Sequence, residues 1–162
     1  MMKSFITLFF VLTFGLFVKA QDVLPNLHLE NLDGETVALQ DISKDGQLVV
    51  VSLWATWCVP CKNELDAIGD VYVDWMDETN VKLYAISVDD SRTVKRVKPL
   101  VNGKGWEFEV LLDTNGDLKR QLNAPTIPVT LIVKDNKILF RHSGYAPGSE
   151  EELYEKIKEF SK

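Results

Sequence analysis

The feature that most constrains this chain is an apolar, strand-like run that leads into two closely spaced cysteines. The run, Gln47 to Leu53, is continuous and rich in β-branched residues, which is typical of a strand covered on both faces of a sheet. Cys58 and Cys61 follow shortly after it. The residues beyond predict a helix from about Val59 to Asp77, so the first cysteine falls at a helix N-terminus.

This placement has a chemical consequence for the two thiols. Unpaired backbone N–H groups and the helix dipole favour an anion at a helix N-terminus, and therefore the reactive thiolate of Cys58. Cys61 lies about one turn later on the same face, where it can attack a mixed disulfide formed through Cys58. Pro60 suits the first turn, where its missing N–H costs nothing. The segment predicts thiol–disulfide exchange, with Cys58 attacking and Cys61 resolving.

Two other uses of the pair are open. A structural disulfide across so short a loop removes little entropy from the unfolded chain, and these are the only two cysteines of the sequence. A zinc site needs four ligands, and only His28 and His142, each in its own expected strand, could complete the set. We favour redox chemistry and expect neither a metal nor another cofactor.

Residues 1–20 have the order of a secretory signal peptide. Lys3 gives a positive start, Phe5 to Val18 is almost entirely apolar, and Ala20 is a small residue at the expected cleavage point. The alternative, a retained anchor, would need roughly 20 apolar residues. We therefore expect an exported, periplasmic or otherwise extracytoplasmic domain over residues 21–162, with no stable membrane span after cleavage.

The composition limits the partners of that domain. The formal net charge of the chain is −6, and the acidic residues are scattered. Nucleic-acid phosphates need clustered Lys and Arg, so no nucleic-acid partner is expected. The length suits one domain with a single substantial core.

Periodicity and turn signals predict an α/β fold, a mixed sheet with helices on both faces. Further strands are expected at Val23 to Glu30, Glu35 to Leu39, Val81 to Val88, Phe108 to Leu112, Val129 to Val133 and Ile138 to Arg141.

The expected helices carry apolar stripes and capping signals. In the first helix the stripe is Leu65, Ile68, Tyr72 and Trp75. A second helix, capped by Ser91, presents Val94, Val97 and Val101, and a short helix falls within Asp113 to Leu122. The last has a capping box at Ser149 and Glu152 and a stripe of Leu153, Ile157 and Phe160.

The segment Trp54-Ala55-Thr56-Trp57-Cys58-Val59-Pro60-Cys61-Lys62 resembles the active-site segment of the thioredoxin superfamily. It is most similar to the exported branch that includes the TlpA-like and ResA-like proteins, and the element order from Val23 to Phe160 agrees. The resemblance implies a thioredoxin-like fold with an N-terminal hairpin and a mid-domain strand–helix insertion at about Ser91 to Leu122.

The same resemblance suggests how a partner binds. In this superfamily a cis-proline opens the strand that faces the cysteines, and Pro128 occupies that place, so a cis Ile127–Pro128 bond is expected. The backbone of Ile127 would pair with an extended partner segment, as in strand addition. Trp57, expected to be partly exposed, and Pro60 are assigned to the same partner-binding surface, whereas Trp54 is expected in the core.

Glu64 is the most informative secondary residue. The ResA-like branch carries a glutamate at this position, and its charge would oppose thiolate formation, raise a cysteine pKa and make the pair more reducing. Its alternative role is to complement the helix dipole. The chain departs from thioredoxin at Ser52, where a proton-handling aspartate stands in that protein, so Glu64 is expected to substitute. It also departs from its branch at Leu65-Asp66, where a proline often follows the glutamate.

We expect this protein to reduce disulfides in exported proteins. An unidentified electron donor would then return its own cysteine pair to the dithiol form. The resemblance also implies apocytochrome c, before haem attachment, as a candidate substrate. A disulfide-donating oxidase remains an alternative, because Val59-Pro60 does not decide the direction. A non-catalytic binding module that docks partners at Trp57 and Pro128 is the alternative from another class. A peroxiredoxin-type peroxidase is disfavoured, because it needs a lone peroxidatic cysteine in a different pattern.

Overall fold

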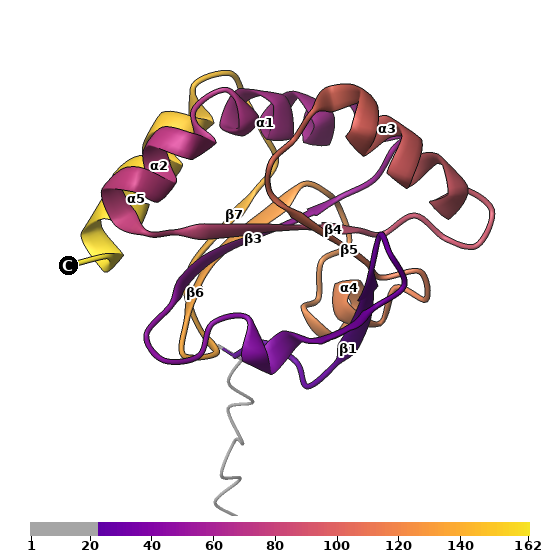
Figure 1. The fold of residues 1–162 in the computed structure, drawn as a ribbon, viewed down its shortest axis with the longest axis horizontal. Coiled ribbons are helices and arrows are strands. Elements are labelled where there is room, and N and C mark those ends of the chain that lie inside the picture. The colour runs from indigo at the N-terminus through magenta and orange to yellow at the C-terminus, as the bar shows by residue number, and fades with distance from the viewer. Residues whose placement is uncertain (1–22) are drawn as a thin grey trace, which may run out of the picture.

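The computed structural model describes residues 23–162, which form one seven-stranded mixed sheet flanked by helices (Figure 1). The strand order is β2-β1-β5-β4-β3-β6-β7. This confirms the predicted fold class. The expected signal peptide, residues 1–20, lies outside the described residues. The strands are β1 (His28–Asn31), β2 (Thr36–Ala38), β3 (Leu48–Trp54), β4 (Lys82–Ser87), β5 (Glu109–Leu112), β6 (Val129–Lys134) and β7 (Lys137–Ser143).

Strand β3 lies inside the sheet, between β4 and β6, and all seven of its residues are buried. It pairs in parallel with β4 and antiparallel with β6, while β5 continues the parallel part beyond β4. The hairpins β1–β2 and β6–β7 close the two sides. A strand that is paired on both edges and covered on both faces has a continuously apolar sequence, as residues 47–53 do.

The helices divide unequally between the two faces (Figure 1). Four of them cover one face, and α4 lies on the other beside the N-terminal segment. The helices are α1 (Val59–Gly69), α2 (Tyr72–Thr79), α3 (Val97–Lys104), α4 (Asp117–Gln121) and α5 (Ser149–Phe160), with 3₁₀ turns η1 (Leu39–Asp41) and η2 (Val94–Arg96). No described helix has the length and apolar character that crossing a membrane requires.

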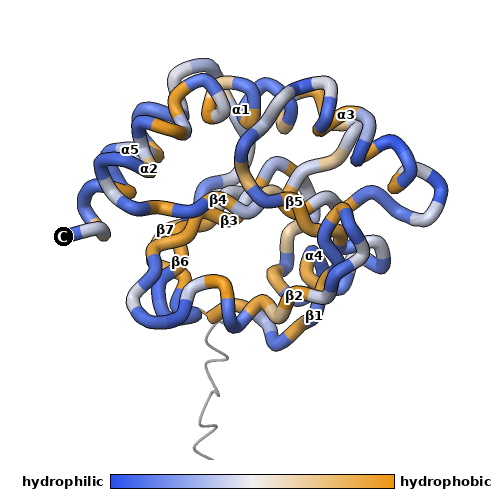
Figure 2. Tube along the Cα trace, in the orientation of Figure 1, coloured by the Kyte–Doolittle hydropathy of each residue, from blue (hydrophilic) through white to orange (hydrophobic). Residues whose placement is uncertain are grey.

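Each face has its own hydrophobic core. Under the four helices, the predicted stripe of α1 and α2 is buried together with Trp54, as expected. On the other face, Leu29 and Leu39 of the N-terminal segment pack with the inward side chains of β3 and β6. Figure 2 shows the hydrophobic colour concentrated along the central strands and the inner sides of the helices.

The helix predicted over residues 59–77 is two helices. It breaks at Asp70 and Val71, after Gly69. Glycine is a poor helix former, and the ring of Trp106 would lie 3.2 Å from a Cβ at Gly69. The close packing of Trp106 therefore accounts for the glycine at the break.

Both predicted serine caps are wrong. The turn η2 begins after Thr93, and Asp90 rather than Ser91 accepts hydrogen bonds from the backbone there. Helix α5 begins at Ser149 itself, with Gly148 as the N-cap at φ 95°, so no capping box forms. Capping depends on backbone geometry at a single residue, which spacing alone does not specify.

The two hairpins form with altered bounds. The N-terminal hairpin is shorter than expected, and Val23 instead makes an isolated bridge to Lys137. The β6–β7 turn consists of Asp135 and Asn136, both with positive φ, so each strand extends one residue closer to the turn than the predicted ends at Val133 and Ile138. Two residues with positive φ are the geometry of a tight hairpin turn.

Candidate active site

The cysteine pair lies where β3 ends and α1 begins. Cys58 is the N-cap residue of α1, as predicted, and it forms a disulfide with Cys61, with the two Cα atoms 5.3 Å apart. The backbone N–H of Cys61 points at the Cys58 sulfur, 3.3 Å away. The first turn of the helix therefore directs a donor at the sulfur that would carry negative charge after reduction.

The two sulfurs differ in access to solvent. Cys58 is 6% exposed, and Cys61 is completely buried. Trp57 and Val59 beside Cys58 are 56% and 60% exposed, so an apolar rim surrounds the more accessible cysteine. A partner disulfide approaching from solvent would meet Cys58 before Cys61.

A cis peptide bond between Ile127 and Pro128 faces the pair, which confirms the predicted isomer. The carbonyl oxygen of Ile127 lies 3.9 Å from the Cys58 sulfur. Ile127 is half-buried, whereas Pro128 is buried just before β6. The loop before β6 and the start of α1 therefore form one surface around Cys58.

Glu64 is a buried carboxylate on α1, one turn beyond Cys61. The hydroxyl of Ser52 donates to its Oε2 at 2.9 Å, and the hydroxyl of Thr130 donates to its Oε1 at 2.8 Å. Burial raises the pKa of Glu64, and these two hydrogen bonds oppose the increase. Glu64 therefore keeps its proton to a higher pH than an exposed glutamate does.

The position of Ser52 explains how the acid fits. Serine on the strand takes up little volume, and the carboxylate of Glu64 enters from the helix to contact its hydroxyl. The sequence links Ser52 to Glu64 through the family resemblance but does not single out Thr130. Thr130 lies directly opposite Ser52 on β6, so the alternation of β6 after Pro128 could have identified it.

Asp89, a completely buried acid just after β4, is a further residue that no sequence motif points to. It accepts hydrogen bonds from the backbone N–H and the hydroxyl of Thr56, at 2.8 and 2.6 Å, and from the hydroxyl of Ser87 at 2.8 Å. Because Thr56 lies two residues before Cys58, Asp89 anchors the loop that carries the cysteine pair.

The two histidines are far from one another in the sheet. His28 is exposed on β1, near one edge, while His142 is half-buried on β7, the strand at the other edge. Within residues 23–162, no group of three or more His, Cys, Asp and Glu side chains is arranged to hold a metal ion.

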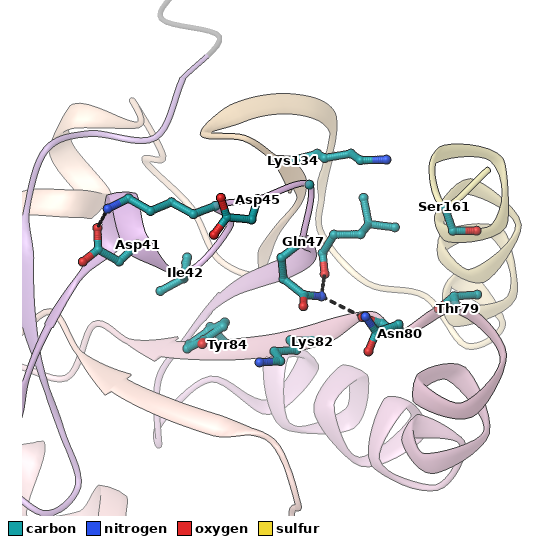
Figure 3. Close-up of a pocket in the computed structure, with 13 residues that line it drawn as sticks. Asp41, Ile42, Asp45, Gln47, Thr79, Asn80, Lys82, Tyr84, Lys134 and Ser161 are labelled. Carbon is teal, nitrogen blue, oxygen red and sulfur yellow. Dashed lines mark hydrogen bonds and ion pairs between the residues drawn. The ribbon is translucent and has the colours of Figure 1, made fainter.

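A large surface hollow lies elsewhere. Figure 3 shows it between Asp41, Gln47, Asn80 and Lys82, at the end of β3 and β4 opposite to the cysteines. Its volume is about 540 Å³, and Gln47 bridges its wall by donating to the carbonyl oxygens of Leu48 and Asn80. The length of β3 and β4 thus separates the hollow from the cysteine pair. The candidate active site is therefore at the cysteine pair and not at the hollow.

Comparisons with known proteins agree with this geometry. The model of the AhpC/TSA family matches residues 20–142. A thiol-disulfide oxidoreductase ResA from Oceanobacillus iheyensis is 33% identical over 71% of this chain, which spans 59% of that relative's length. A thiol-disulfide oxidoreductase ResA from Bacillus thuringiensis subsp. konkukian is 26% identical over 94% of this chain and 86% of its own length.

Solved structures extend the comparison to the fold. An uncharacterized thioredoxin-like protein from Porphyromonas gingivalis is 47% identical, with a TM-score of 0.75 over 85% of this chain and 91% of its own. StoA from Bacillus subtilis, at 24% identity, shares the fold, with a TM-score of 0.66 over 87% of this chain and 99% of its own. From its fold, its cysteine pair and the extent of the family match, the chain belongs to the AhpC/TSA family, as a thioredoxin-like member with relatives of the ResA type.

Proposed function

We propose that this thiol–disulfide oxidoreductase reduces disulfides of exported protein partners, with Cys58 as the nucleophile and Cys61 as the resolving thiol. One observation carries the proposal: Cys58 caps α1 within an exposed rim, and Cys61 is buried one turn behind it. A partner disulfide can reach the sulfur of Cys58. The sulfur of Cys61 can react only with the mixed disulfide that Cys58 has already formed.

The first step forms the mixed disulfide. The Cys58 thiolate, stabilised by the N-terminus of α1, attacks one sulfur of the partner disulfide. A bond forms between Cys58 and that sulfur, and the partner's S–S bond breaks. The leaving partner thiolate takes a proton from solvent.

The second step releases the partner. Cys61 transfers its proton to the Glu64 carboxylate, and the resulting thiolate attacks the Cys58 sulfur. The Cys58–Cys61 disulfide forms, the mixed disulfide breaks, and the second partner thiolate takes up a proton. The protein loses two electrons to the partner, whose two thiolates take up two protons from solvent. The protein itself loses only the proton of Cys61, which Glu64 must pass on to solvent.

The binding surface orients the partner for both steps. We assign Trp57 and Pro60 to the rim around Cys58, and the backbone of Ile127, before Pro128, to pairing with an extended partner segment. The 3.9 Å distance between the Ile127 carbonyl oxygen and the Cys58 sulfur supports this assignment, because a segment paired there would lie beside the reacting sulfur.

The same proposal states that the pair acts as a reductant and that it acts outside the cytoplasm. A buried acid near the cysteines opposes the thiolates and so favours a reducing pair. Relatives named ResA and the signal-peptide pattern of residues 1–20 support action outside the cytoplasm, with apocytochrome c cysteines as one candidate substrate and an unidentified donor that restores the dithiol.

The equilibrium reduction potential of the pair tests the direction. Incubation in thiol redox buffers, followed by alkylation and mass measurement, should give a value near the thioredoxin end of the range, about −270 mV. A value near about −120 mV would reverse the assignment to a disulfide donor.

A Cys61→Ser variant tests whether exchange occurs at all. It should accumulate covalent mixed disulfides through Cys58, because nothing resolves them. The Cys58→Ser variant is the matched control and should accumulate far fewer, since Cys61 is buried. Absence of trapped partners in the first variant would leave a non-catalytic binding module as the better description.

A further inference from the structure

We propose that His142 is the proton-relay residue through which Glu64 exchanges its proton with solvent during resolution by Cys61. The inference rests on the proposed function, because it concerns the proton that Cys61 gives up there. It assigns a role to a histidine that the sequence marks only as a strand residue.

A row of polar side chains crosses three strands beneath Glu64. Ser52 on β3 pairs with Thr130 on β6, and Thr130 pairs with His142 on β7. Directly paired residues point to the same face of a sheet, with Cβ atoms roughly 4.5–5.5 Å apart. The row therefore leads from the buried carboxylate outward to β7, the edge strand (Figure 1).

Glu64 contacts the inner part of this row. Its carboxylate accepts from Ser52 and Thr130, and His142 is the next side chain outward from Thr130. Burial falls along the same direction, since Ser52 and Thr130 are buried and His142 is half-buried. Imidazole accepts and donates protons readily near neutral pH, which serine and threonine hydroxyls do not.

A small cavity connects the acid with the histidine. Glu64, Thr130 and His142 line it together with Ser149 and Glu150 at the start of α5, and its volume is about 10 Å³. That is about the space of one water molecule, and its lining supplies the polar partners that a water needs. One water molecule in this cavity would bridge the carboxylate and the imidazole, so the two groups do not need to be in direct contact.

Carboxyl groups from two helices line the cavity with His142, and a loop tyrosine contacts one of them. Glu64 comes from α1, Glu150 and Glu152 come from α5, and Tyr145 of the β7–α5 loop donates to Glu150 at 3.0 Å. Burial is the main cause of the raised pKa of Glu64, with His142 lowering it and Glu150 raising it by their charges. The positive charge that His142 carries after taking up the proton thus acts on Glu64.

The relay completes the proton balance of resolution. Cys61 gives its proton to the Glu64 carboxylate, which becomes neutral. Before the Cys61 thiolate attacks, Glu64 passes the proton to the imidazole of His142, directly or through one water, so that Cys61 cannot take it back. The imidazolium then releases the proton to solvent. No electrons move in these transfers, and both side chains return to their starting states.

The test follows the two thiol steps separately. Reduced protein is mixed with one equivalent of the chromogenic disulfide 5,5′-dithiobis(2-nitrobenzoate). Attack by Cys58 releases the first coloured thiolate, and resolution by Cys61 releases the second. His142→Ala should leave the first phase unchanged and slow the second about ten-fold near neutral pH. This factor is below the usual range for lost acid–base catalysis, because solvent retains some access to Glu64.

Rescue and controls distinguish a relay from a structural role. Added imidazole should restore the second phase of His142→Ala, and the deficit should shrink at alkaline pH, where hydroxide takes the proton. His28→Ala, the matched control at the only other histidine, should behave as wild type. His142→Gln keeps a polar side chain of similar size and should be as slow as the alanine variant in the absence of imidazole.

The experiment distinguishes failure of the proposed function from failure of the His142 relay. If the wild-type protein shows no second phase, the proposed function itself fails. The relay alone is overturned if wild type resolves normally and both His142 variants match it at every pH. It is also overturned if both variants are slow and imidazole restores neither.

Discussion

Glu64 places a buried carboxylate from α1 over strand β3 of the sheet. A serine at position 52 leaves space above the central strand, and the carboxylate of Glu64 enters that space from α1. Two hydroxyl donors then satisfy the carboxylate that burial would otherwise disfavour. The acid is consequently held in one orientation, close to Cys61 along the helix.

Replacing Glu64 by glutamine should make the cysteine pair less reducing. The substitution removes a buried negative charge that opposes the thiolates. One pKa unit on one thiol corresponds to about 1.4 kcal/mol, which is roughly 30 mV for a two-electron couple. Redox-buffer titration of both proteins measures the shift, and Asp66→Asn on the same helix controls for loss of charge alone. A potential unchanged in Glu64→Gln would contradict the electrostatic role.

Glu64 should also make the stability of the oxidised protein depend on pH. Its folded-state pKa lies above the ordinary value of 4.5, so the folded state holds the proton over a window in which the unfolded chain has lost it. Its stabilising contribution is complete below the unfolded pKa and is lost as pH rises through the folded pKa. Urea unfolding of wild type and Glu64→Gln should show the difference between them changing across this window, with wild type losing relative stability as pH increases. A constant difference would show that Glu64 titrates normally.

At the scale of elements, the important connection is between the end of β4 and the loop that precedes α1. Asp89 makes this connection through Thr56, although the two residues belong to neighbouring strand ends rather than neighbouring sequence. Parallel pairing of β3 and β4 brings those ends together. The loop that carries Cys58 is thereby fixed to the end of β4 at Thr56.

Asp89→Ala should destabilise the protein by about 3 kcal/mol, because hydrogen bonds to a charged group are lost and buried donors of Thr56 and Ser87 remain unpaired. Urea unfolding at fixed pH measures the loss. Asp77→Ala, at an exposed position of α2, is the comparison and should change stability by less than about 0.5 kcal/mol. Equal effects of the two substitutions would refute the anchoring role of Asp89.

Elements whose pattern is strong were predicted correctly, whereas their ends were not. The stripe of α1 and α2 specifies one buried face whether the helix is continuous or broken, so periodicity found the face but not the break after Gly69. The packing of Trp106 against Gly69 joins residues far apart in sequence. Likewise, Ser149 has capping spacing, but the chain uses Gly148 with positive φ.

At the scale of the whole molecule, stability rests on two cores rather than on surface charge. Every described ion pair joins side chains that are at least 37% exposed. Such pairs contribute little, because water and salt screen them. The N-terminal hairpin and η1 belong to the second core and are not an appendage, since Leu29 and Leu39 are buried in it.

Leu39→Ala should therefore lower the free energy of unfolding of the whole protein by about 3 kcal/mol in one cooperative transition, as expected for a truncated core leucine. Val23→Ala, at a side chain that is 44% exposed, should have a much smaller effect. Fluorescence and circular dichroism followed against urea should coincide. An early separate transition would mean that the N-terminal segment unfolds independently of the sheet.

The sequence by itself determined the central strand, the placement of Cys58 at the start of a helix, the facing proline and the class of fold. The strand and the helix start depend on local patterns, namely apolar periodicity and the spacing of two cysteines, whereas the facing proline follows from the resemblance to a known family. Only the tertiary structure decided the surroundings of Glu64 and the anchoring of Thr56 by Asp89. Sheet register brings Ser52, Thr130 and His142 into one row, and register arises from pairing between strands far apart in the chain, which no local pattern specifies.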